Sequence, residues 1–141
     1  MRFIITATTD DTKAKTDAPF SDDLFAAYMK FNEDMHTAGV LVAAEGLIPG
    51  GAGARIAVAG GKRKVIDGPF TEAKELVGGF YVIDVPSLEE AKSWALRCPV
   101  GLGSDDILEI RQLTGAEEIP PEVLAVAIRV APTWTASFLK K

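Results

Sequence analysis

The chain has 141 residues, a length that favours a single domain with enough residues to build a hydrophobic core. Its formal net charge is −5 and its densest basic run is only Lys62 to Lys64, which argues against binding to the nucleic-acid backbone. Cys98 is the single cysteine, so an intramolecular disulfide is excluded and a cytoplasmic location is expected. No segment approaches the roughly 18 apolar residues of a membrane span, and one His with one Cys predicts neither a metal site nor a cofactor.

The first half of the chain predicts a strand, a helix and a second strand. Residues 2–8 form a β-branched and aromatic run that is typical of a strand. Ser21 is a good helix N-cap, and Gly39 predicts the end of the helix that follows. Residues 40–48 then resemble a buried strand interrupted by one charge. The apolar face of the helix recurs at steps of three and four: Leu24, Tyr28, Phe31, Met35 and Ala38.

The second half predicts a hairpin and then a strand, a helix and a strand. Residues 54–59 and 62–66 are expected to pair around a Gly60-Gly61 turn. Residues 79–85 form a strong strand, Ser87 caps a second helix in the capping-box pattern, and residues 106–113 form the last strand.

This order predicts an α+β fold with the ferredoxin-like βαββαβ plan, an antiparallel sheet and one inserted β-hairpin. Helices cover one face of such a sheet, so the other face must meet a partner or hold a ligand. The plan accounts for residues 1–113. Residues 114–141 form an extension with a possible helix over 121–130, and its apolar end is expected to dock on the body or on a second subunit.

Three stretches, at residues 38–47 (AGVLVAAEGL), 67–91 (DGPFTEAKELVGGFYVIDVPSLEEA) and 94–99 (WALRCP), carry a resemblance. Because these motifs occur in this order and at this spacing, the chain resembles the YCII-related family, and in particular its branch named for the tetrapeptide Asp-Gly-Pro-Phe. With the first and last strands the resemblance extends over about residues 2–113. It implies a homodimer in which two ferredoxin-like subunits pack sheet against sheet as a dimeric α/β-barrel.

The resemblance also bears on activity. A few relatives are similar to enzymes that act on small cyclic or chlorinated aromatic-derived substrates through a His and Asp pair. The acid of that pair matches Asp67, whereas the first strand here has no His and the single histidine, His36, lies in the first helix. The branch is also associated with sigma factors of the extracytoplasmic-function type, which implies a possible regulatory role.

Asp67 has two interpretations. A carboxylate placed directly after a strand acts as a general acid or base if burial shifts its pKa towards neutrality. Alternatively, Asp67 begins a tight turn around Pro69 and its side chain binds backbone N–H groups.

Glu45 interrupts an apolar strand, where alternation places it on one face with Leu41, Ala43 and Leu47. A charge on that face needs a salt bridge, for example to Arg55 or Lys74, or it lines a wet cleft together with Asp67. In the second case the two acids divide acid and base work.

The residues around this cleft complete the predicted site. Phe70 and Tyr81 are expected to wall the pocket and Lys74 and Glu75 to clamp a ligand. The alternative for Phe70 and Tyr81 is core packing, and the alternative for Lys74 and Glu75 is a solvated surface. The leading hypothesis is a small-molecule site, enzymatic or ligand-sensing, in a cleft between the sheet and the helices that is rimmed by Asp67, with Glu45 as its helper. The alternative is a non-catalytic regulatory or interaction module.

Overall fold

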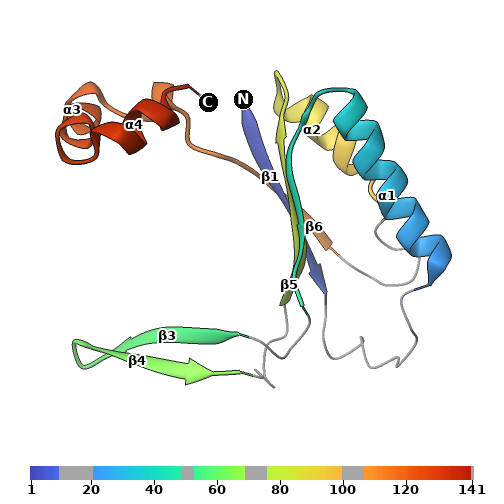
Figure 1. Cartoon of the computed structure of the whole chain (residues 1–141), viewed down its shortest axis with the longest axis horizontal. Helices are drawn as coiled ribbons and strands as arrows, with labels where there is room; N and C mark the ends of the chain where they lie inside the picture. The colour runs from blue at the N-terminus through green and yellow to red at the C-terminus, as the bar shows by residue number, and fades with distance from the viewer. Residues whose placement is uncertain (10–20, 49–52, 69–75, 100–106, 141) are drawn as a thin grey trace.

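The computed structural model describes residues 1–9, 21–48, 53–68, 76–99 and 107–140. A four-stranded sheet forms the centre of the molecule (Figure 1). Its strands follow the order β2-β5-β1-β6, and each neighbouring pair is antiparallel. The bounds of these strands are β1 Arg2–Thr9, β2 Leu41–Gly46, β5 Leu76–Asp84 and β6 Ile107–Gln112. This strand order with antiparallel neighbours is the ferredoxin-like arrangement that the order of elements predicted.

Two helices pack on one face of this sheet, α1 (Asp22–Thr37) and α2 (Leu88–Ala95) (Figure 1). Both begin at the predicted serine caps. The Ser21 Oγ accepts a hydrogen bond from the Leu24 N–H and the Ser87 Oγ accepts one from the Glu90 N–H, each at 3.2 Å. Such caps satisfy backbone donors that the first turn of a helix leaves without an intrahelical partner.

The hydrophobic core lies between these helices and the sheet. Met35 and Ile83 are fully buried, and Tyr28, Leu41, Leu108 and Ile110 pack around the buried set. Among the described helices, none combines the length and the apolar character that a membrane crossing needs. The buried core residues are Phe3, Ile5, Phe31, Met35, Ile83, Val85, Ala91, Ala95 and Cys98.

The inserted hairpin consists of β3 (Ala54–Ala59) and β4 (Lys62–Asp67) and forms a separate two-stranded sheet. Gly60 and Gly61 have φ angles of 58° and 75°, the left-handed values that a two-residue type I′ turn requires. The predicted turn is therefore confirmed. The hairpin leaves the central sheet at one end. It projects outward on the side of the sheet that α1 and α2 leave uncovered (Figure 1).

The described part of the extension, residues 114–140, projects on the same side as the hairpin but at the opposite end of the sheet (Figure 1). It contains a short 3₁₀ turn (Ala116–Glu118), α3 (Pro121–Val130) and α4 (Pro132–Phe138). The helix over residues 121–130 was predicted, whereas α4 was not. A proline at the first position of each helix fits its missing N–H donor.

Candidate functional site

The face of the sheet opposite α1 and α2 is where the sequence placed a ligand or a partner. Strand pairing fixes which residues share it, because directly opposed residues point the same way. Phe80 on β5 pairs with Thr6 on β1 and with Glu45 on β2, and Thr6 pairs in turn with Glu109 on β6. The next row along the strands contains Ala43, Val82, Ile4 and Arg111.

The two rows give this surface, which we call the open face, a mixed character. Its centre is formed by the partly exposed side chains of Ile4, Phe80 and Val82. Its two edge strands carry charged groups, with Glu45 on β2 and Glu109 on β6. An apolar floor with charges at its rim suits a flat apolar ligand that also carries polar groups.

Glu45 reaches the open face through an irregularity that the sequence did not reveal. A register shift between Leu41 and Ala43 places Val42 outside the regular pairing, so Leu41 pairs with the buried Ile83 and packs against the core. The expectation that Leu41 and Glu45 share a face is therefore wrong. A bulge inserts one residue into a strand and reverses the alternation beyond it. Ala43 and Glu45 share one face as predicted, but this is the open face, so Glu45 does not line a cleft between the sheet and the helices; its side chain is exposed.

Asp67 is the last residue of β4, where it pairs with Ala54, and it is exposed. The backbone N–H of Gly68 donates a 2.8 Å hydrogen bond to the Gly53 carbonyl, which closes the base of the hairpin. Glu45 lies one residue before the end of β2, and the hairpin base lies at that same end of the sheet (Figure 1). Both acids of the predicted site therefore belong to one end of the molecule.

Tyr81 points into the core rather than towards the open face. It pairs with Ile5 and Ala44, and its ring meets Phe31 of α1 edge-on with centroids 5.4 Å apart. Burial, with a smaller contribution from Cys98, raises the pKa of the Tyr81 phenol above its usual range. Tyr81 and Glu45 thus lie on opposite faces of the sheet. The other predicted ligand contacts, Phe70, Lys74 and Glu75, lie outside the described residues.

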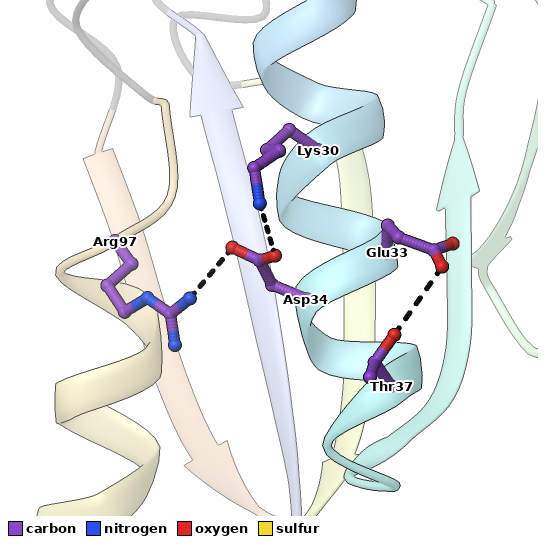
Figure 2. A network of polar contacts seen from close by, with 5 residues as sticks. All are labelled: Lys30, Glu33, Asp34, Thr37 and Arg97. Atoms are coloured by element: carbon purple, nitrogen blue, oxygen red, sulfur yellow. Dashed lines mark hydrogen bonds and ion pairs between the residues drawn. The ribbon is translucent and has the colours of Figure 1, made fainter.

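A polar network that was not predicted from the sequence lies on the outer side of the helices (Figure 2). Asp34 of α1 accepts hydrogen bonds from Lys30 Nζ at 2.6 Å and from Arg97 Nη2 at 2.9 Å. The hydrogen bond from Lys30 contributes most to holding the pKa of the Asp34 carboxyl below its usual range. Arg97 also lies over the Trp94 ring, 4.2 Å from its centroid. Lys30 and Asp34 are spaced for a pair within one helix, but Arg97 is 63 residues away from Asp34, so no local pattern reveals that contact.

Two hollows lie elsewhere on the described surface. One of about 390 Å³ borders the polar network, and its lining includes Phe31, Asp34, Arg97 and Cys98. The other, of about 140 Å³, lies where the extension meets the ends of the strands, and its lining includes Asp84 and Phe138. Neither hollow is lined by Glu45 or Asp67. The charged residues that line the larger hollow, Lys30, Asp34 and Arg97, pair with one another. The hollow is therefore explained by the contact between α1 and the segment that follows α2.

Known proteins resemble this chain in sequence and in fold. The family model described as the YCII-related domain matches residues 1–115. An uncharacterized protein of Rhizobium meliloti (strain 1021) is 36% identical over 102 residues, which are 72% of each chain. A solved structure, 5-chloro-2-hydroxyhydroquinone dehydrochlorinase (TftG) from Burkholderia phenoliruptrix AC1100 in complex with 2,5-dihydroxybenzoquinone, is similar with a TM-score of 0.50. That match has 15% sequence identity and covers 85% of this chain and 100% of the other.

Proposed function

Because the chain belongs to the YCII-related family, we propose that it binds a small molecule on the open face, with Glu45 and Asp67 as the carboxylates of the site. The observation that carries this proposal is the strand register, which sets Glu45 directly beside Phe80 on a face that neither α1 nor α2 covers. An aromatic ring next to a carboxylate offers stacking and a charge-assisted hydrogen bond to one ligand. A hydroxylated ring is the ligand class that uses both.

The site is completed by a second copy of the chain. In one copy the open face leaves Ile4, Phe80 and Val82 partly exposed, and burial of apolar surface favours a cover. Two sheets packed face to face would enclose the ligand between them and exclude water. In that setting a carboxylate accepts or returns a proton effectively, so the same geometry serves either catalysis or ligand sensing.

Ligand binding tests the roles of the two acids. The probe is hydroquinone, a hydroxylated ring that keeps both hydroxyl protons at neutral pH, whereas the 2,5-dihydroxybenzoquinone held by the solved neighbour is a vinylogous acid and ionises. Glu45→Gln and Asp67→Asn should each weaken its binding about tenfold, the usual effect of losing a hydrogen bond to a charged group. Glu89→Gln is the matched control, since Glu89 is exposed on α2 and pairs with Lys92 instead. Equal affinities for all four proteins, measured by calorimetric titration, would refute the assigned roles.

The alternative is an interaction module without chemistry. It is favoured by α3, whose ten residues include none that is buried. Under this alternative the hydroquinone probe would not bind, and removal of residues 115–141 would abolish capture of the partner while the body stayed folded. The link to an extracytoplasmic-function sigma factor and the cytoplasmic location stay predictions.

A further inference from the structure

The β3–β4 hairpin lacks a core of its own. Every residue of β4 is exposed, and Ile56, Val58 and Val65 are 62%, 72% and 59% exposed. Ile56 pairs with Val65, and Val58 lies two residues further along β3, so the three side chains share one face. An isolated two-stranded hairpin is only marginally stable in water. This apolar face therefore needs a cover.

The extension has the same deficiency. Helix α3 contains apolar residues on nearly all sides, a pattern that usually belongs to a buried helix. Its Val123, Val126 and Val130 recur at steps of three and four and form one exposed stripe. On α4, the Trp134 ring stacks on Phe138 at 5.2 Å but remains 61% exposed. The extension thus also presents an apolar surface without a cover.

The charges of the hairpin and of the first part of the extension, residues 115–130, are opposite in sign, whereas Lys140 adds a cation at the far end of the extension. The hairpin carries four cations, Arg55, Lys62, Arg63 and Lys64, against the single carboxylate Asp67. Residues 115–130 carry three carboxylates, Glu117, Glu118 and Glu122, against the single cation Arg129. A basic and an acidic surface attract and orient each other on association.

The two elements cannot satisfy each other within one chain, because they project from opposite ends of the sheet (Figure 1). They do project on the same side, the side of the open face. A two-fold axis that lies between two facing sheets and runs across the strands exchanges the two ends. Under that symmetry the hairpin of one copy and the extension of the other copy lie at the same end of the dimer, twice per dimer.

We infer that a second copy of this chain is the partner of both surfaces, with the apolar face of one hairpin packed against the α3 stripe of the other copy. The inference rests on the proposed pairing of open faces and adds how the two copies are oriented. It also gives the hairpin a place in the site, because the Asp67 of one copy then lies beside the interface at which the ligand is enclosed.

Chemical crosslinking between two differently tagged chains tests this orientation. Both carry Cys98→Ala, which removes the natural thiol; one adds Val58→Cys on the hairpin and the other Val126→Cys on α3. The chains are co-expressed, the mixed species is purified through both tags, and a short bifunctional maleimide is added. A covalent dimer is expected in the mixed sample, and little is expected when either single variant is treated alone.

Other outcomes overturn the inference in distinguishable ways. A crosslink in the Val58→Cys sample alone, or in the Val126→Cys sample alone, would show that hairpin meets hairpin or extension meets extension. The two-fold axis would then run along the strands. A dimer in sedimentation without any crosslink would leave the pairing of open faces intact and refute the hairpin contact. A monomer in sedimentation would refute both. If the hairpin instead binds an unrelated protein, no crosslink forms between the two variant chains, and this outcome also refutes the hairpin contact.

Charge reversal provides a second test that leaves Cys98 in place. The two reversals are Arg63→Glu and Glu122→Lys. Arg63 lies opposite Val58 on the apolar face of the hairpin, and Glu122 lies in the first turn of α3. Each single reversal should raise the dimer dissociation constant at least about threefold at low salt, and the double reversal should recover most of the loss. Additive losses in the double variant would contradict a direct hairpin–extension contact.

Discussion

Gly79 of β5 is the position at which one added methyl group should disturb both the sheet and the proposed site. A Cβ placed on Gly79 would lie 2.9 Å from the Glu45 carbonyl oxygen and 3.5 Å from the Gly46 Cα. Both contacts are with the backbone of β2, which cannot rotate away as a side chain can. Gly79→Ala must therefore displace the strand that carries Glu45. Overpacking of this kind costs about 1–3 kcal/mol, which we expect as a loss in the free energy of unfolding by urea.

Gly46→Ala is the matched control, because Gly46 is the cross-strand partner of Gly79 and a Cβ there meets nothing within 4 Å. Its free energy of unfolding should change by less than about 1 kcal/mol, in the stabilising direction, through the reduced entropy of the unfolded chain. Both variants are measured at one protein concentration, since association contributes to stability. Equal stabilities for Gly79→Ala and Gly46→Ala would refute the close approach of β2 to β5.

Three further predictions concern the core and two titrating groups. Met35→Ala removes a fully buried side chain and should lower the free energy of unfolding by about 2–5 kcal/mol, whereas Met29→Ala, at a 44% exposed position, should change it little in the same urea titration. The lowered pKa of Asp34 means that its charged form stabilises the fold at neutral pH. Asp34→Asn should therefore have a lower urea midpoint than the wild type at pH 7, and the gap should close as pH falls through the lowered pKa; a gap that persists in acid would contradict the pairing with Lys30. The raised pKa of Tyr81 means that folding favours the neutral phenol, so wild-type stability should fall above about pH 10, and the urea midpoint of Tyr81→Phe should fall less.

Local signals in the sequence predicted much of the fold. Ser21 and Ser87 are caps whose hydrogen bonds reach only three residues along the chain, and Gly60-Gly61 defines its turn through backbone conformation alone. The strand order then follows from the sequence of elements, because few topologies satisfy the rules of chain connection. These features depend on neighbours in the chain, so one sequence suffices to predict them.

The features that were missed depend on contacts between distant segments. The irregularity near Val42 appears only when β2 pairs with β5, and it alone decides that Leu41 belongs to the core. The sequence places Tyr81 in a strand but does not show which face of the sheet it occupies. Its contact with Phe31 depends on where α1 crosses the sheet. Helix α4 begins at a proline directly after α3, a position at which local patterns predict a break rather than a new helix.

Sedimentation equilibrium at micromolar concentration tests most directly whether the open face is a surface that a second copy covers. Wild-type protein should sediment at twice the chain mass of 15.0 kDa. Val82→Asp, which places a charge between Ile4 and Ala43 at the centre of the open face, should keep its circular dichroism spectrum and sediment near the single-chain mass. A wild-type protein that sediments as a single chain, or a Val82→Asp protein that remains a full dimer, would contradict the proposed role of the open face.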